Sequence, residues 1–152
     1  MNNDYFLDTS AFTKRYKNEP GHEYIDKIFS TNNQIFYLSV TYCEIIKIFY
    51  RLYKYPQLND KQISEKEFNL LNAKLATDLF YVNRISVTDE IVNKSREILE
   101  MGWLKASIDV LILSGFIVTK DIYKNLYFIT ADDDLSDLAK KFTNDFINLN
   151  KI

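Results

Sequence analysis

The chain has 152 residues, a formal net charge of -2 and a 47% share of hydrophobic residues, including 11 Tyr and 11 Phe. This composition argues against disorder and predicts a single folded domain over residues 1–152 with a substantial core. Because the net charge is slightly negative, any polyanionic partner must be held by a local basic patch or by metal ions. The only cysteine, Cys43, excludes an internal disulfide. No stretch reads as a signal peptide or a bilayer span, so we expect a cytoplasmic protein with no membrane partner.

Short apolar runs alternate along the chain with longer segments in which apolar residues recur at helical spacing. Strands are predicted at 5–7, 35–38, 84–87, 126–129 and, at a sheet edge, 146–149. Helices are predicted at 11–16, 23–29, 39–53, 64–80, 89–101 and 107–119, with a last helix ending near 142 and a loop at 55–60. This alternation predicts an α/β fold with a mainly parallel sheet and helices on both faces. Right-handed crossovers then gather the carboxyl ends of the strands at one edge, where ligands bind in open α/β sheets.

Several local signals mark the ends of these helices. Ser64 and Glu67 form a capping-box pattern, and Thr88 is placed to cap the helix that follows it. Ser107 can cap the next helix in the same way. Gly102 is expected to end the helix before it as a left-handed C′ residue.

Acidic residues follow the predicted strands or open the helices beside them: Asp8, Glu44, Asp109 and Asp132. Each has an explanation that requires no chemistry. Asp8 and Asp132 can cap the helices that follow them, and Thr41 with Glu44 forms a capping-box pattern. Asp109 is a favourable first-turn acid. Taken singly, these structural explanations are preferred.

Taken together, the acids indicate chemistry at the common strand edge. Clustered carboxylates repel one another unless a cation offsets their charge, and hard divalent ions such as Mg²⁺ and Mn²⁺ bind oxygen ligands. No Cys and His set has the spacing of a zinc site, and the only histidine is His22, beside Pro20 and Gly21. That excludes a Ser-His-Asp or Cys-His mechanism. The pattern suits metal-assisted hydrolysis of a phosphodiester.

Motifs that suit this reading are spread over nearly the whole chain. They are Leu7-Asp8-Thr9-Ser10-Ala11, Lys14-Arg15-Tyr16, Glu19-Pro20-Gly21, Leu38-Ser39-Val40 leading to Glu44, Ile63 to Phe68, Val87-Thr88-Asp89-Glu90, Leu104 to Asp109, and Phe128-Ile129-Thr130-Ala131-Asp132. In this collinear order the sequence resembles the PIN-domain ribonucleases, especially the VapC-type toxins of bacterial toxin–antitoxin pairs.

The resemblance implies a compact three-layer α/β/α fold and an endoribonuclease that hydrolyses RNA. It implies an acidic site whose members are catalytic residues and ligands of Mg²⁺ or Mn²⁺: Asp8, Glu44, Asp109 and Asp132. Supporting hydrogen bonds would come from the hydroxyls of Thr9, Ser10 and Thr130. Asp134 and Asp137 are further candidate ligands. The implied partners are the RNA substrate, a cognate antitoxin encoded beside this chain and a second copy of the chain in a homodimer.

Two places depart from the family's usual pattern. The family often has a His three residues after the third acid, where this chain has Ile112. It also often has Lys or Arg directly after the fourth acid, where Asp133 and Asp134 follow here. We interpret the first departure as a matter of helix packing. The second weakens the phosphate contact that is expected at that position.

Other functions compete with this one. A signalling receiver domain also clusters acids at strand ends, but by resemblance it needs an acidic pair near the first strand and a Lys after the last, and both are absent. A phosphatase of the haloacid dehalogenase type resembles Asp-x-Asp after the first strand, and here Ser10 takes the second place. A PIN-like binding module that no longer cleaves is a third alternative, and the complete set of acids counts against it.

Two surfaces are expected to bind partners. Helices 41–53 and 64–80 are predicted to form a protruding arm rich in aromatic residues: Phe49, Tyr50, Tyr53 and Tyr55. Such surface suits a groove for an antitoxin helix, unless the rings pack between the two helices. Near Asp8, a basic rim is expected to bind RNA through Lys14, Arg15 and Lys17, with solvated surface charges as the alternative.

Overall fold

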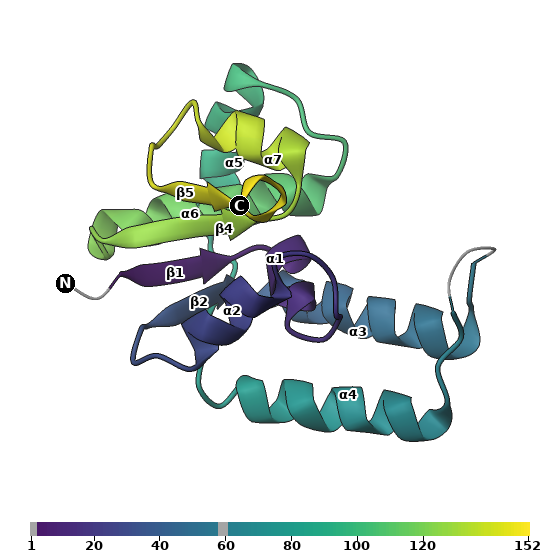
Figure 1. Ribbon diagram of the computed structural model, residues 1–152. Coiled ribbons are helices and arrows are strands. Elements are labelled where there is room, and N and C mark those ends of the chain that lie inside the picture. The colour runs from purple at the N-terminus through teal and green to yellow at the C-terminus, as the bar shows by residue number, and fades with distance from the viewer. Residues whose placement is uncertain (1–2, 58–60) are drawn as a thin grey trace.

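A parallel sheet forms the centre of the molecule. The computed structural model describes residues 3–57 and 61–152, so the end of the loop expected at 55–60 lies outside the described residues. The five strands lie in the order β3-β2-β1-β4-β5 and all neighbours are parallel. They are β1 (Asp4–Leu7), β2 (Ile35–Leu38), β3 (Asn83–Ile85), β4 (Leu126–Thr130) and β5 (Phe146–Asn148). The chain thus starts in the middle of the sheet, builds outward to β3, and returns to the other side of β1 with β4 (Figure 1).

Helices cover both faces of this sheet. One face carries α1 (Thr9–Lys14), α2 (His22–Phe29), α3 (Ser39–Lys54) and α4 (Glu65–Asp78). The other carries α5 (Asp89–Met101), α6 (Ser107–Ile122) and α7 (Asp133–Ala139). A short 3-10 helix, η1 (Leu149–Lys151), follows β5. The predicted three-layer α/β/α fold with a parallel sheet is therefore confirmed.

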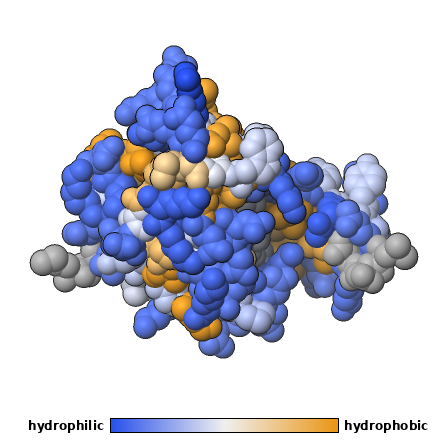
Figure 2. Space-filling model, turned by 90° about the horizontal axis from the view of Figure 1, so that it is seen from above, coloured by the Kyte–Doolittle hydropathy of each residue, from blue (hydrophilic) through white to orange (hydrophobic). Residues whose placement is uncertain are grey.

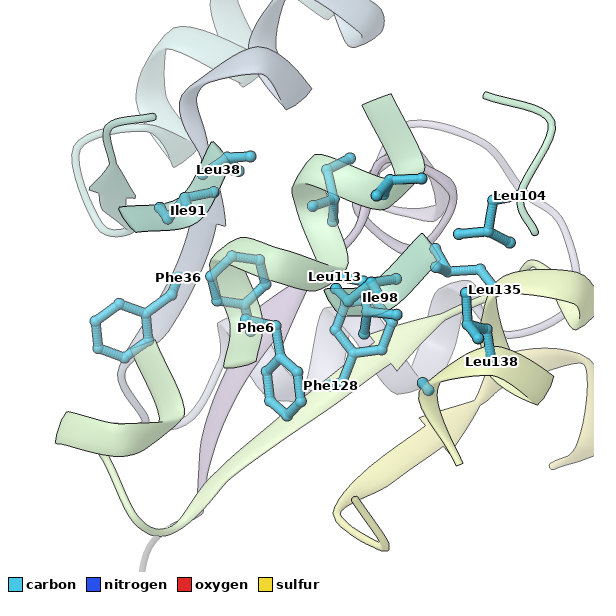
Figure 3. Packing of buried hydrophobic residues seen from close by; sticks show 14 of the residues in the cluster. Phe6, Phe36, Leu38, Ile91, Ile98, Leu104, Leu113, Phe128, Leu135 and Leu138 are labelled. Carbon is cyan, nitrogen blue, oxygen red and sulfur yellow. The ribbon is translucent and has the colours of Figure 1, made fainter. Parts of the chain in front are cut away.

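Alternate residues of each strand supply two separate cores. Phe6 and Phe128 pack on the side of α5, α6 and α7 (Figure 3), whereas their neighbours Leu7 and Ile129 pack on the side of α1 to α4. Successive side chains of a strand point to opposite faces. Because both faces of this sheet are covered, the inner strand β2 is buried and apolar throughout, and its neighbours β1 and β4 are mainly apolar. This produces the continuous apolar runs of the sequence.

The longest buried helix, α6, lies close against the sheet. A Cβ atom added at Gly115 would stand 2.9 Å from Cδ1 of Leu38 and 3.5 Å from Cζ of Phe6. Glycine is thus required at this point for the close approach of helix and sheet. The helix continues past Thr119, its expected end, to Ile122.

The two helices of the predicted arm, α3 and α4, lie side by side and continue beyond the sheet (Figure 1). Tyr50 and Tyr53 of α3 both pack on the ring of Phe68 in α4, with centroids 4.9 and 4.7 Å apart. Phe49 belongs to the core and is 2% exposed, so its expected place on the aromatic surface is wrong. Tyr55, at 71%, is the most exposed of these rings. Much of the aromatic surface therefore joins the two helices of the arm.

Some of the predicted helix caps are confirmed and others are wrong. Ser64 and Glu67 form the capping box, and Thr88 accepts from the amide of Ile91. Thr41 does not cap, because α3 begins directly at the end of β2 and encloses it. Ser107 does not cap α6 either, and Gly102 adopts an extended conformation with φ 174° where a left-handed residue was expected. Among the described residues, no helix is both long enough and apolar enough to cross a membrane.

Candidate active site

The candidate site lies at the topological switch point of the sheet, between β1 and β4. The strands β1 and β4 are neighbours, with Leu7 paired to Ile129, yet the chain visits β2 and β3 between them. In open α/β sheets the carboxyl ends of two such strands border the crevice that binds ligands. Asp8 follows β1 directly, and Thr130 is the last residue of β4. Residues distant in sequence thereby meet at one point.

Asp8 is held from several directions. Its carboxylate accepts a hydrogen bond of 2.6 Å from the amide of Ala11 and thus caps α1. The hydroxyl of Ser10 donates to its two oxygens at 2.9 and 2.8 Å, and the hydroxyl of Thr130 donates to Oδ2 at 2.6 Å. The side chain is only 2% exposed. Asp8 is therefore a helix cap and also a fixed carboxylate at the crevice.

The hydroxyls of Ser10 and Thr130 also tie β4 to α1 and α7. The amide of Ala131 donates to Oγ of Ser10 at 2.7 Å, and the amide of Asp132 donates to Oγ1 of Thr130 at 2.9 Å. Each hydroxyl thus accepts from the backbone after β4 and donates to Asp8. This network fixes the start of α7 relative to β1.

The other acids reach the same edge from three helices. Glu44, in the second turn of α3, accepts a short hydrogen bond from the hydroxyl of Thr9. Asp132 caps α7 by accepting from the amide of Leu135 at 2.8 Å. Asp109 lies half-buried in the first turn of α6. The four predicted acids are thus placed at the ends of separate elements around the crevice.

The acids influence one another electrostatically. Burial, together with the negative charges of Glu44 and Asp132, raises the pKa of Asp109 to about 6. Burial raises the pKa of Asp8, the hydrogen bonds from Thr130, Ala11 and Ser10 oppose that rise, and the charge of Asp109 adds to it; the net result is a pKa of about 7. The charges of Glu44 and Asp132 act on Asp109, and the charge of Asp109 acts on Asp8. The four acids therefore form one acidic centre.

The donor chemistry of this centre fits a hard divalent cation. Its side chains offer carboxylate oxygens and hydroxyls, which are the ligands that Mg²⁺ and Mn²⁺ prefer. As they stand, no three His, Cys, Asp or Glu side chains of the described residues are grouped closely enough to hold an ion. The carboxylates instead accept hydrogen bonds from Thr9, Ser10 and Thr130. A bound cation would compete with these donors and would offset the repulsion that raises the pKa of Asp109.

The two further candidate ligands lie on α7, the helix that Asp132 caps. Asp134 and Asp137 are exposed on α7 and line a cavity of about 280 Å³ together with Trp103, Lys105 and neighbouring residues. Asp137 is also paired with Lys140 at 2.5 Å. Neither contributes to the raised pKa values of Asp8 and Asp109. They therefore stand apart from the electrostatic interactions among the four acids.

The expected basic rim is occupied by internal ion pairs. Lys14 and Lys17 both contact Glu19, at 3.2 and 3.6 Å. The guanidinium of Arg15 donates to Asp78 through two nitrogens at 3.2 Å each, and to Asp26 at 2.6 Å. To reach a phosphate, Arg15 would have to leave both carboxylates.

The Arg15 network was not anticipated from the sequence. Asp78, at the end of α4, is 5% exposed, and Arg15 also lies 4.7 Å from the centre of the Phe29 ring. The amine of Lys74 donates to the backbone carbonyl of Arg15 at 2.7 Å. These contacts join α1, which follows Asp8, to α2 and to the arm. The local sequence around a buried Asp at the end of a polar helix does not predict which residue it pairs with.

The fold and the site together define an α/β domain with an acidic centre at the switch point of a parallel sheet. The model of the PIN domain family matches residues 5–141, so the chain belongs to that family. PIN domains are nucleases, and the family predicted from the sequence is thereby confirmed. No curated protein matches the chain significantly.

Solved structures share this fold at low sequence identity. A chain of FitAcB from Neisseria gonorrhoeae is 16% identical with a TM-score of 0.68, over 97% of this chain and 99% of that chain. A chain of VapBC2 from Rickettsia felis, bound to a DNA fragment from their promoter, is 18% identical with a TM-score of 0.60, over 88% and 92%. A chain of DNA-bound VapBC from Salmonella typhimurium is 14% identical with a TM-score of 0.61, over 98% and 99%.

Proposed function

We propose that this protein is a metal-dependent endoribonuclease that acts as the toxin of a toxin–antitoxin pair. The observation that carries the proposal is the coupling of Asp8, Glu44, Asp109 and Asp132 at the switch point of a PIN fold. These acids would hold Mg²⁺ or Mn²⁺. When bound, such an ion lowers the pKa of a coordinated water and offsets charge on the phosphate.

The residues of the chain have distinct parts in this proposal. Ser10, Thr130 and the amide of Ala11 keep the two oxygens of Asp8 in one orientation. Thr9 does the same for Glu44. Asp109, in the first turn of α6, is suited to accept a proton at a carboxylate oxygen from the attacking water.

The proposed protein partner is an antitoxin encoded beside this chain. The similar folds in the VapBC and FitAcB structures support this proposal at the level of the fold. The arm formed by α3 and α4 exposes Tyr55 at its free end and Tyr50 along α3, at 71% and 43%. These exposed rings suit contact with the apolar face of a helix from the antitoxin. We also propose that the toxin forms a homodimer, and size measurements on the purified chain test this.

The nuclease proposal is tested with a labelled RNA. The purified chain is incubated with it in EDTA, in Mg²⁺ and in Mn²⁺, and the products are separated by size. We expect internal cleavage only with the divalent ions. Cleavage that continues in EDTA would contradict the metal dependence. Intact RNA under all three conditions, with a folded protein, would favour the non-cleaving binding module.

A further inference from the structure

The loop between α5 and α6 presents an aromatic ring and a cation beside the acidic centre. Trp103, the only tryptophan of the chain, is 80% exposed. Lys105 is also exposed and, among the described residues, has no ion-pair partner, unlike Lys14, Arg15 and Lys17. The loop leads directly into α6, whose first turn carries Asp109. The loop thus lies at the end of α6 that carries Asp109.

The neighbours of Trp103 anchor the loop and leave the indole outside. A Cβ atom at Gly102 would stand 2.7 Å from Cδ1 of Leu138, so the backbone lies tightly against α7. Leu104 is 5% exposed and points into the core toward Leu135 and Leu138 (Figure 3). The amine of Lys141 donates to the carbonyl of Met101 at 2.6 Å. Trp103 is thus held outward by fixed residues on both sides.

A cavity lies beneath this ring, between the loop and α7. It has a volume of about 280 Å³ and is lined on one side by Trp103 and Lys105 and on the other by Asp134, Asp137 and Lys141. Asp134 lies two positions after Asp132. Figure 1 shows the loop descending beside α7 on the side toward which the strands point. The cavity therefore lies at the same edge of the sheet as the acidic centre, on the side of α7, and the four acids of the centre are not among its lining residues.

We propose that this cavity is a nucleotide-binding subsite that holds a base of single-stranded RNA on Trp103 and its phosphate near Lys105. The inference rests on the proposed nuclease function. Exposed aromatic rings next to cations are how proteins bind single strands, because every base has a face that can stack. The carboxylate of Asp134 can accept from the amino group of a base, as carboxylates do from cytosine. The side of the cavity formed by Asp134 can thus bind a base, and the side formed by Lys105 can bind a phosphate.

A protein partner is the competing occupant. A second cavity of about 360 Å³, on the other side of the loop, is mainly apolar and is also bordered by Trp103 and Lys105; its other lining residues include Val92, Leu99, Leu104 and Leu111. Figure 2, which views the side of α5 and α7, shows hydrophobic side chains among mainly hydrophilic ones. The first cavity combines Trp103 and Lys105 with the polar side chains of Asp134, Asp137 and Lys141. This polar lining favours RNA, since a purely apolar contact does not explain it.

The subsite is tested with a short, labelled single-stranded RNA containing every base. Cleavage in Mn²⁺ is measured for the wild type, Trp103→Ala, Trp103→Phe and, as an equally exposed aromatic away from the site, Phe80→Ala, where Phe80 is 93% exposed. We expect Trp103→Ala to raise KM about tenfold with kcat retained, as loss of one stacked base would. Trp103→Phe should retain most of the affinity, and Phe80→Ala should match the wild type.

The cation is tested by the salt dependence of binding. Lys105→Gln should reduce the slope of log affinity against log salt by about 0.7, the value for one lost phosphate contact on a single strand. The matched control is Lys124→Gln, an exposed lysine just before β4, at the opposite edge of the sheet. RNA should also quench the emission of the wild type, in which Trp103 is the only tryptophan.

The outcomes separate this inference from the nuclease proposal. Wild-type KM in Trp103→Ala, with active wild type, would overturn the subsite and leave the nuclease intact. If the tryptophan emission does not change with RNA but shifts with protein concentration, Trp103 belongs to a protein interface. That result would also overturn the subsite. A wild type that neither binds nor cleaves RNA would overturn both proposals.

Discussion

Thr130, the last residue of β4, donates a hydrogen bond of 2.6 Å to Oδ2 of Asp8, the first residue after β1. The same hydroxyl accepts from the amide of Asp132 at 2.9 Å. One side chain therefore connects two acids of the centre across neighbouring strands. From the switch point of the sheet, Thr130 thus fixes Asp8 relative to the start of α7.

Thr130→Val should reduce cleavage by at least about tenfold, because outer hydrogen-bond partners of metal ligands have effects of this size. It should also cost about 1–3 kcal/mol of stability, since it leaves polar groups unpaired. Thr119→Val is the matched control: Thr119 is a buried threonine of α6 whose hydroxyl donates to the carbonyl of Gly115 at 2.7 Å. The control should lose stability and keep its activity. Equal loss of activity in both would show that Thr130 acts only through the fold.

The stability of the metal-free protein should fall as pH rises. Burial raises the pKa of Asp8 from 3.8 to about 7, so the folded state binds this proton more tightly than the unfolded state. The resulting stability is complete below the unfolded pKa and is lost as pH rises through the folded pKa. The shift corresponds to about 4 kcal/mol for the buried Asp8. Thermal melts in EDTA should show this fall, and Asp8→Asn should show a flatter profile. Parallel profiles would contradict the raised pKa.

Replacing Arg15 should reduce the stability of the fold more than it reduces RNA binding. Arg15→Gln leaves the buried Asp78 without its guanidinium partner, and breaking such a pair costs about 3–5 kcal/mol. Lys17→Gln is the control, because its pair with Glu19 is more exposed and is worth at most about 1 kcal/mol. Denaturant unfolding measures both. A similar small loss in both variants would show that the Arg15 network contributes little to the fold.

The exposed end of the arm should contribute to antitoxin binding. Tyr55→Ala removes a ring that is 71% exposed, so it should weaken binding of the cognate antitoxin several-fold without disturbing the core. Tyr50→Ala with Tyr53→Ala should weaken binding as well, and should also loosen the arm, since both rings pack on Phe68. Tyr81→Ala, at the opposite end of α4, is the control. Titration calorimetry gives the affinities; unchanged binding in the Tyr55 variant would place the antitoxin elsewhere.

The parts of the fold that follow from local apolar pattern could be predicted from the sequence. The strand 35–38 is found as expected, because a strand covered on both faces has no polar positions to blur its limits. The acids could be placed at one edge because parallel strands put their carboxyl ends there. Asp8 and Asp132 serve as caps and also belong to the acidic centre, so the two explanations offered for them do not exclude each other.

The parts that depend on distant contacts could not be predicted. The partners of Arg15 lie in α2 and α4, and no periodicity links them to it. Thr41 has the spacing of a cap, but α3 begins at Ser39 with no intervening loop, so Thr41 lies inside the helix and is fully buried. Phe49 and Tyr50 are adjacent aromatic residues of α3, yet one lies in the core and the other is exposed. Only the packing of α3 against the sheet decides between them.

The central claim is that the coupled acids cleave RNA with the help of a divalent ion. The most direct measurement compares the cleavage of a labelled RNA in Mn²⁺ by the wild type, Asp8→Asn, Asp109→Asn and Asp121→Asn. Asp121 is an exposed acid near the other end of α6, so its variant controls for the substitution itself. The account predicts loss of cleavage in Asp8→Asn and Asp109→Asn, with native circular dichroism, and full activity in Asp121→Asn. Wild-type cleavage rates in Asp8→Asn or Asp109→Asn would contradict it.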